Sequence, residues 1–253
     1  MSFPESASAW RELLSAFSEF DKLFSEGPKA VRGPVATAEG YQNLATMLAL
    51  SLDMNFFADP VAPRFVDLLT PYRPDRRWGG DNTDCYYSYA VVDPRRTYRV
   101  SGSPNDSAMY SITVYNEPEP GAWPNRTVGL LYDTDMGLDD EGRFACVLGP
   151  KRPTGYEGPF IELSDDARGI LTRDYHEHPD TGRRVDWPSG RASGWRSARM
   201  SGISAYMSWA ERSVARSDFA TAASVFGGTT GSPAWSTTST VQSTLRPVSG
   251  CSW

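Results

Sequence analysis

Two stretches near the start of the chain carry apolar residues at helical spacing. In the first, over residues 8–26, large apolar side chains recur every three or four positions, namely at Trp10, Leu13, Leu14, Phe17, Phe20 and Phe24. In the second, Thr37 is a candidate N-cap, Asp59 and Pro60 form a stop signal, and the stripe between them comprises Tyr41, Leu44, Leu48, Leu52 and Phe56. The pattern predicts a helical lead-in over residues 1–70, with a short third helix or turn at residues 64–69.

From residue 86 the apolar positions alternate with polar ones, as in half-buried antiparallel strands. The alternation predicts strands over residues 87–91, 98–100, 110–114, 130–132, 144–148, 160–163 and 170–175. Turn sequences at residues 93–96 and 103–106 suggest a meander of the first three strands, and the turn at residues 139–142 suggests a hairpin from 130–132 into 144–148.

No helix-length segment separates these strands, which disfavours a parallel sheet. We therefore predict an α+β, mainly β fold: a helical N-terminal lead-in followed by an antiparallel, jelly-roll-like β-sandwich over residues 71–215. After a helix-like stretch at residues 206–214 the composition changes. Between Phe219 and Trp253 the single charged residue is Arg246, and Ser, Thr and Gly dominate. Residues 216–253 are expected to form a loose or disordered tail, or a segment that is not the natural continuation of the domain.

Charge and composition disfavour a nucleic-acid-binding protein and a membrane-spanning protein. A formal net charge of -6 and a pI near 5.0 repel nucleic acid, and Arg73, Arg76 and Arg77 are too few to form an opposing patch. Mean hydropathy is -0.45 and no long apolar run occurs, so no membrane span is expected. Three scattered Cys and an N-terminus without a signal-peptide pattern favour a cytoplasmic protein with reduced thiols.

Residues 76–87 hold the densest group of chemically useful side chains. A Gly pair there allows close backbone approach to a ligand. Asp81 and Asp84 are candidate catalytic carboxylates, of which one could be held ionised by a neighbouring Arg while the other acts as a general base. The candidate ligand-binding residues around them supply charge, stacking and hydrogen bonds, and they are Arg76, Arg77, Trp78, Asn82 and Tyr86. The segment predicts a small-molecule site, and the sequence identifies no cofactor, substrate or oligomeric state.

Each of these residues also has a structural interpretation. Asp and Asn in Gly-rich loops commonly hydrogen-bond nearby backbone, so Asp81 and Asp84 could cap the loop. Trp78 could be buried between the helices and the sheet. In that case the segment joins the lead-in to the sandwich, and the protein is a scaffold or interaction module.

A third hypothesis is metal-dependent catalysis. His176 and His178 are the only histidines, and on a strand they would share a face and could hold a metal with a distant carboxylate. The turn sequence at residues 179–182 favours solvated imidazoles instead. Cys85 as a nucleophile served by a His is the weaker interpretation, because single Cys at strand starts are commonly small buried hydrophobes.

Several motifs resemble the family called domain of unknown function 1214 and its relative, domain of unknown function 1254. They are Arg-Trp-Gly-Gly-Asp-Asn at residues 77–82, Tyr-Arg-Val-Ser-Gly at 98–102, Tyr-Ser-Ile-Thr-Val-Tyr at 110–115 and Asp-Glu-Gly-Arg-Phe at 140–144. The resemblance spans about residues 30–190. It implies a jelly-roll-like β-sandwich in a bacterial protein of uncharacterised biochemistry, with no established activity. It also implies further β-rich sequence where this chain has its Ser/Thr-rich tail.

Overall fold

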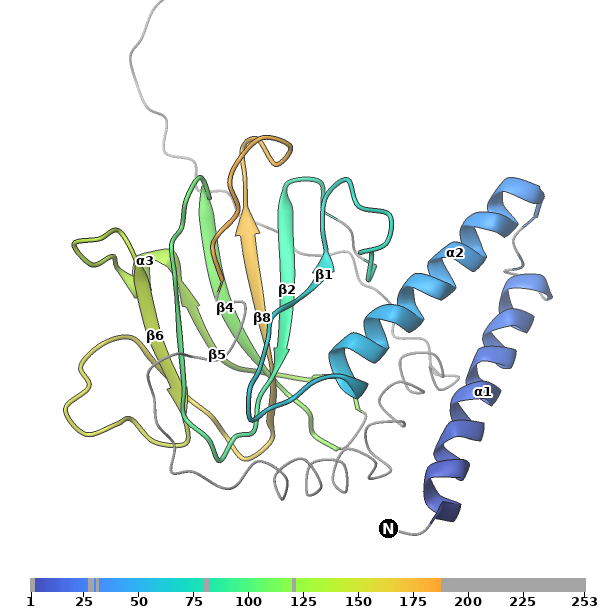
Figure 1. Ribbon diagram of the computed structural model, residues 1–253, viewed down its shortest axis with the longest axis horizontal. Coiled ribbons are helices and arrows are strands. Elements are labelled where there is room, and N and C mark those ends of the chain that lie inside the picture. The colour runs from blue at the N-terminus through green and yellow to red at the C-terminus, as the bar shows by residue number, and fades with distance from the viewer. Residues whose placement is uncertain (1–2, 27–29, 31, 80–81, 120–121, 188–253) are drawn as a thin grey trace, which may run out of the picture.

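A computed structural model describes residues 3–26, 30, 32–79, 82–119 and 122–187. Helices and strands follow in the order α1 (Phe3–Ser25), α2 (Pro34–Ser51), the π-helical turn η1 (Leu52–Phe56), β1 (Val66–Leu69), β2 (Cys85–Val91), β3 (Tyr98–Gly102), β4 (Met109–Asn116), β5 (Thr127–Tyr132), α3 (Asp133–Met136), β6 (Phe144–Gly149), β7 (Phe160–Glu162) and β8 (Ala167–Tyr175) (Figure 1). The α+β, mainly β class with N-terminal helices is confirmed.

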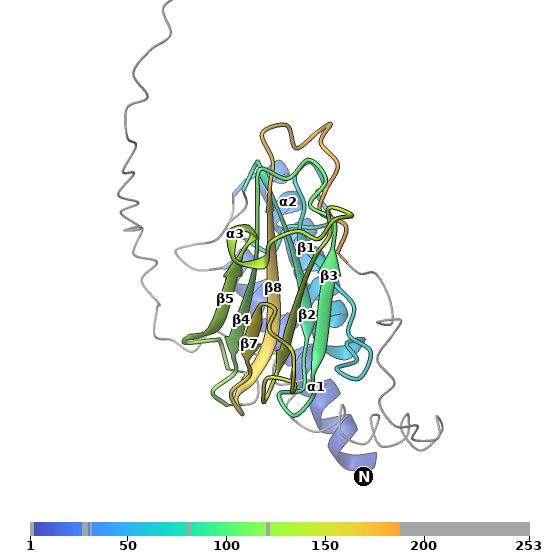
Figure 2. The same cartoon turned by 90° about the vertical axis from the view of Figure 1, so that its left-hand side faces the viewer.

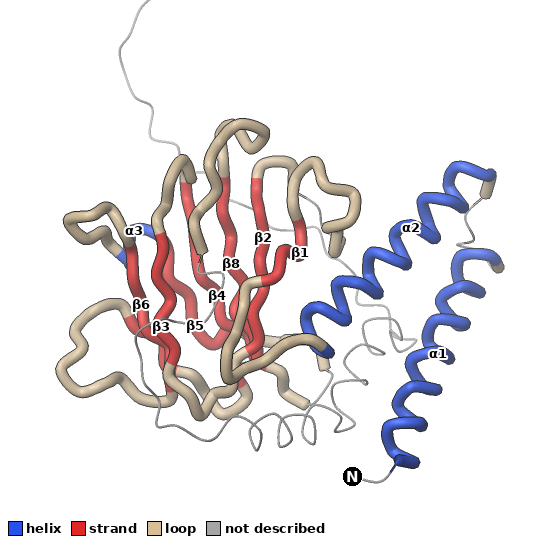
Figure 3. Tube along the Cα trace, viewed as in Figure 1, coloured by secondary structure: helices blue, strands red, loops and turns tan. Residues whose placement is uncertain are grey.

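The two long helices extend to one side of the strands, next to β1 (Figure 3). α2 begins three residues before the predicted N-cap Thr37, because Pro34 has the backbone angle of a first helical position. The Thr37 hydroxyl instead donates a hydrogen bond to the Gly33 carbonyl inside the first turn (2.8 Å). Helix α1 buries Leu13 but leaves Trp10 and Leu14 each 53% exposed, so the predicted stripe is only partly covered. Within the described part of the chain, no helix has both the length and the apolar character needed to cross a bilayer.

The strands form two sheets that lie as two layers, with β4 and β5 on one side and β3 on the other (Figure 2). The five-stranded sheet has the order β1-β2-β8-β4-β5 and is antiparallel throughout. The three-stranded sheet has the order β3-β6-β7, in which β3 and β6 are antiparallel and β6 and β7 parallel. The jelly-roll connectivity implied by the family resemblance remains a prediction.

The predicted strands are present, but three local predictions are wrong. Residues 66–69, expected as helix or turn, form β1 and pair with β2. The expected meander does not form, since β3 lies in the other sheet and β8 pairs between β2 and β4. The expected hairpin between β5 and β6 is instead a crossover between the sheets. The alternation of a strand fixes which face its side chains occupy, but it carries no information about which strand is the neighbour.

The core lies between the two sheets. Phe144 is 1% exposed and packs against Tyr110 and Trp187, with ring centroids 4.8 and 5.3 Å away. Ile112 from β4 and Ile170 from β8 are also buried, so the even-numbered residues of these central strands face inward. The odd-numbered residues of the same strands consequently form the outer face of the five-stranded sheet.

Candidate functional site

The outer face of the five-stranded sheet has an arginine at its centre. Arg173, on the central strand β8, lies opposite Tyr87 of β2 and Ser111 of β4. Its Nη1 donates to the Thr113 hydroxyl (2.7 Å) and its Nη2 to the Tyr115 hydroxyl (3.1 Å). The guanidinium carbon also lies 5.7 Å from the centre of the Tyr87 ring. These contacts hold a partly buried cation in one orientation.

Arg173 remains charged in this environment. Burial by itself lowers the pKa of Arg173, but the hydrogen bond to Tyr115 and the neighbouring phenols outweigh it and raise that pKa above its ordinary value. No carboxylate forms an ion pair with Arg173 among the residues that the structure describes. A partly buried cation surrounded by neutral hydroxyls is unusual, because buried charges are ordinarily paired.

A second group of side chains adjoins Arg173 at the start of β2. Cys85 lies opposite Tyr175 in the sheet register, and burial together with the nearby Tyr175 raises the pKa of Tyr87. Burial raises the pKa of the Cys85 thiol to about 11. Because the thiolate is the reactive form, this environment disfavours Cys85 as a nucleophile.

Two residues of the predicted site segment interact with aromatic side chains. Burial raises the pKa of Tyr87 of β2, and the nearby Asn82 side chain acts in the opposite direction. Trp78 packs against Trp123, with ring centroids 6.5 Å apart, and Trp123 lies in the loop that follows β4. Trp123 is 57% exposed. The segment therefore contributes the indole of Trp78, which packs on Trp123, and the amide of Asn82 near Tyr87.

The remaining predicted residues have other surroundings. Arg76 forms an ion pair with Asp53 of η1 (3.4 Å), and Arg77 is exposed. Asn82 Oδ1 accepts the Asp84 backbone N–H, which is the capping role considered above for this loop. The Asp84 side chain is exposed. Gly80 and Asp81 lie outside the described residues, so the predicted pairing of the two carboxylates stays a prediction.

Tyr86 points into the molecule, away from the Arg173 face. Its hydroxyl donates to the Pro179 carbonyl (2.5 Å), and the Arg184 guanidinium carbon lies 4.2 Å from its ring centre. The His176 ring meets Tyr86 edge-on at 5.4 Å, and His176 Nε2 lies 2.8 Å from Asp174 Oδ1. Tyr86 is 8% exposed and is part of this buried polar cluster.

The two histidines are not brought together as a metal site. His176 is 4% exposed and lies in the cluster around Asp174, whereas His178 is exposed in the turn after β8. Across the part of the chain that is described, no three His, Cys, Asp or Glu side chains are grouped as metal ligands.

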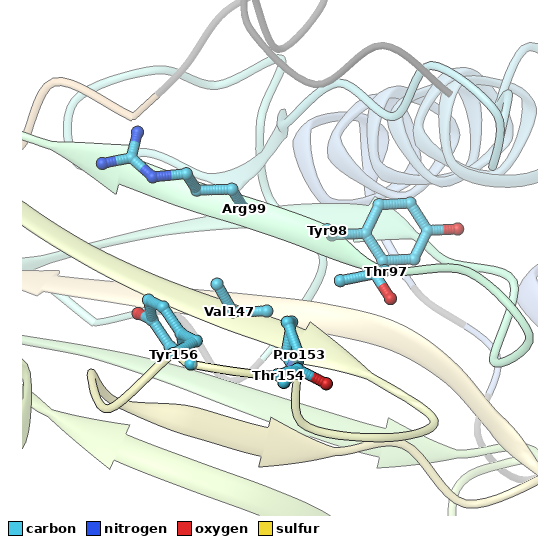
Figure 4. Close-up of a pocket in the computed structure, with 8 residues that line it drawn as sticks. Thr97, Tyr98, Arg99, Val147, Pro153, Thr154 and Tyr156 are labelled. Carbon is cyan, nitrogen blue, oxygen red and sulfur yellow. The ribbon is translucent and has the colours of Figure 1, made fainter. Parts of the chain in front are cut away.

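A separate cleft lies on the outer side of the three-stranded sheet (Figure 4). It has a volume of about 240 Å³, and its walls come from β3, β6 and the loop after β6. Val147 of β6 lies between Thr97, which directly precedes β3, and Pro153 and Tyr156 of the loop. The lining is mostly apolar, and the volume lies below the roughly 300–1,000 Å³ of ordinary ligand pockets. No residue of the predicted segment lines it.

Sequence reasoning missed Arg173, Tyr115 and Trp123. A signal for Arg173 was present, because it is a charged residue within the predicted strand over residues 170–175, at a position that alternation assigns to one face. Its proximity to Thr113 and Tyr115, 60 and 58 residues away in the chain, had no signal in the sequence.

Comparison with known proteins supports the fold. No protein-family model and no curated protein sequence matches the chain. The solved structure of an uncharacterized protein from Burkholderia cenocepacia is similar, with a TM-score of 0.66 and 20% identity, covering 87% of this chain and 57% of that one. This chain thus spans little more than half the length of that protein, and the likeness concerns the fold alone. The VPA0106 protein from Vibrio parahaemolyticus matches with a TM-score of 0.34 and 13% identity, and the match covers 71% of this chain and 51% of that protein. A similarity at this level supports no conclusion about the fold.

Proposed function

We propose that this protein binds a small, polar, sugar-like molecule on the outer face of the five-stranded sheet, against the segment at residues 76–86. The observation that carries the proposal is the Trp78 and Trp123 pair, because Trp123 lies in the loop after β4 and exposes 57% of its surface. Sugars have apolar C–H faces that stack on indoles and hydroxyl edges that hydrogen-bond with tyrosine, threonine and asparagine.

The described residues favour binding over a particular reaction. Asp84 is exposed and has no base or nucleophile beside it in the contacts described above, and Cys85 is held as a thiol. The predicted catalytic role of Asp81 and Asp84 therefore remains a hypothesis, and the proposal specifies no catalytic step.

We also propose that the chain belongs with the domain of unknown function 1214 family, on the strength of the four motifs at residues 77–82, 98–102, 110–115 and 140–144. The third motif carries Thr113 and Tyr115, which hold Arg173. We further infer a jelly-roll-like connectivity and a cytoplasmic location, with no nucleic-acid partner for a chain of net charge -6.

Saturation-transfer NMR with methyl β-glucoside as the probe tests the binding proposal. Trp123→Ala is expected to abolish saturation transfer to the sugar C–H protons, because the stacking surface is lost. Trp10→Ala is the matched control, since Trp10 is 53% exposed but lies on α1. Equal transfer in both variants, or none in the unmodified protein, would contradict the proposal.

The scaffold hypothesis has its own support. Arg76 pairs with Asp53 of η1, and the Tyr98 hydroxyl donates to the Pro60 carbonyl, so contacts join the end of the helical lead-in to the sheets. If the segment at residues 76–86 is purely structural, Trp78→Ala will lower the free energy of unfolding while no sugar binds. Denaturant unfolding of Trp78→Ala alongside the NMR measurement separates the two functions.

A further inference from the structure

The cleft on the outer side of the three-stranded sheet has walls that are held in place by their own contacts. On one side, the loop after β6 is held by Arg152, whose Nη1 donates to the Gly158 carbonyl (2.7 Å) and the Tyr156 carbonyl (3.3 Å). On the other side, Thr97 packs closely against Gly149, since a Cβ added to Gly149 would lie 2.8 Å from the Thr97 hydroxyl oxygen. The cleft is therefore formed before a ligand binds, which reduces the entropy lost on binding.

The side chains at the centre of the cleft are apolar. The Tyr156 ring is held because its hydroxyl donates to the Pro159 carbonyl (3.2 Å) and packs over Gly158, where an added Cβ would lie 2.5 Å from that hydroxyl. Figure 4 shows Val147 at the centre of the cleft, with Tyr156 and Arg99 toward one end. An aromatic ring or a short branched chain would bury apolar surface against these side chains.

Arg99 supplies the single charge among the residues that line the cleft. Its Nη1 makes a long contact with the Ser101 hydroxyl (3.4 Å), and within the described ranges Arg99 pairs with no carboxylate. Burial raises the pKa of Tyr156, and the positive charge of Arg99 acts in the opposite direction, so this charge acts at the Tyr156 end of the cleft. A guanidinium matches the two oxygens of a carboxylate. A phosphate dianion would exceed the one positive charge of the lining.

We propose that this cleft binds a small carboxylic acid with a mainly apolar body, which contacts Val147 and Tyr156 while its carboxylate pairs with Arg99. The volume of about 240 Å³ suits a molecule of the size of benzoate, smaller than the ligands of ordinary pockets. The site lies on the other sheet from the proposed sugar site and shares no residue with it. The inference therefore goes beyond the proposed function and does not depend on it.

Titration of the full chain followed by amide NMR shifts tests the inference with three probes: benzoate, benzamide and acetate. Benzoate is expected to shift the amide signals of residues 97–99 and 154–156. It should bind about 3- to 10-fold tighter than benzamide, the neutral molecule of the same shape, a gain between that of an exposed ion pair and that of a hydrogen bond to a charged group. Acetate should bind at least about 10-fold more weakly than benzoate, because it lacks the apolar body.

Three variants assign the contacts. Arg99→Gln should lower the affinity for benzoate to that for benzamide and leave the affinity for benzamide unchanged. Arg143→Gln is the matched control and should keep the preference, because Arg143 is also exposed but directly precedes β6, outside the cleft. Tyr156→Ala removes part of one wall and should weaken both aromatic probes.

The comparison of benzoate with benzamide uses the unmodified protein, so it decides the inference even if Arg99→Gln fails to fold. Equal affinity for the two probes, or shifts confined to residues outside the cleft, would overturn the inference. Neither outcome bears on the sugar site, which the saturation-transfer measurement on Trp123→Ala tests separately.

Discussion

Two consecutive arginines form ion pairs of the same chemistry at different depths, which allows a controlled prediction. Asp67 accepts hydrogen bonds from Arg184 Nη1 and Nη2 at 3.0 and 2.9 Å. Asp106 accepts from Arg183 Nε and Nη2 at 3.2 and 3.1 Å. The side chains of Arg184 and Asp67 are 32% and 28% exposed, whereas those of Arg183 and Asp106 are 73% and 47% exposed.

The loss of unfolding free energy on breaking each ion pair depends on how deeply the pair is buried. Removing one partner of a fully buried pair costs about 3–5 kcal/mol, because the other charge is left uncompensated. Arg184 is also held over the Tyr86 ring, so it cannot easily turn to water, yet the pair retains partial solvent contact. We therefore expect Asp67→Asn to lower the free energy of unfolding by about 2 kcal/mol, between the buried and the exposed cases. Asp106→Asn should change it far less, because water replaces the lost contact.

The pH dependence gives a second check. Burial by itself raises the pKa of Asp67, but the hydrogen bonds and charge of Arg184 outweigh it and lower that pKa overall. A carboxyl group whose pKa is lower in the folded state stabilises the fold above its unfolded pKa, and this contribution is lost as pH falls through the folded pKa. The stability difference between the unmodified protein and Asp67→Asn should thus be full at neutral pH and shrink below about pH 4.

Urea unfolding followed by tryptophan fluorescence, at neutral and at acidic pH, measures both effects. If Asp106→Asn proves as costly as Asp67→Asn, burial does not govern the cost of these pairs. If the cost of Asp67→Asn does not change on acidification, the carboxylate charge is not its source.

Further predictions concern the core and the thiols. Phe144→Ala should lower the free energy of unfolding by about 3–5 kcal/mol in urea titrations, because it empties the centre of the inter-sheet core; a loss typical of a surface site would refute that placement. Gly102→Ala should lower the free energy of unfolding by about 1–3 kcal/mol in the same assay, because a Cβ there would meet the Phe144 ring at 2.9 Å and the Asp186 carbonyl. An unchanged urea midpoint would count against this packing. In a Cys251→Ser background, Cys85 and Cys146 should not react with a thiol-disulfide reagent at pH 8 until the protein unfolds. Burial raises the pKa values of these two thiols to about 11 and about 12, and the thiolate is the reactive form. Reaction of the native protein at the rate of a free thiol would contradict this.

Periodicity in the sequence determined where helix α2 and most of the strands lie along the chain. Apolar spacing placed α2 and the strands within a few residues of their bounds, because helical and extended side-chain periods are local properties of the backbone. The same spacing failed at β1, because a strand of four residues between Pro63 and Pro71 gives too short a pattern to distinguish strand from turn. Residue composition marked the segment at residues 76–87 as chemically dense, and its role as a binding site remains a prediction.

Only the tertiary structure decided which strands are neighbours and which polar groups meet. Arg173 lies on β8, whereas Thr113 and Tyr115 lie on β4, and β5, β6 and β7 come between these two strands in the sequence. The three residues come together because β8 inserts between β2 and β4. Tyr86 and Tyr87 are adjacent in the chain but point to opposite faces, one into a buried cluster and one toward the arginine. Local periodicity specifies the direction of each side chain, whereas strand pairing depends on burying both sheets against each other, a property of the whole chain.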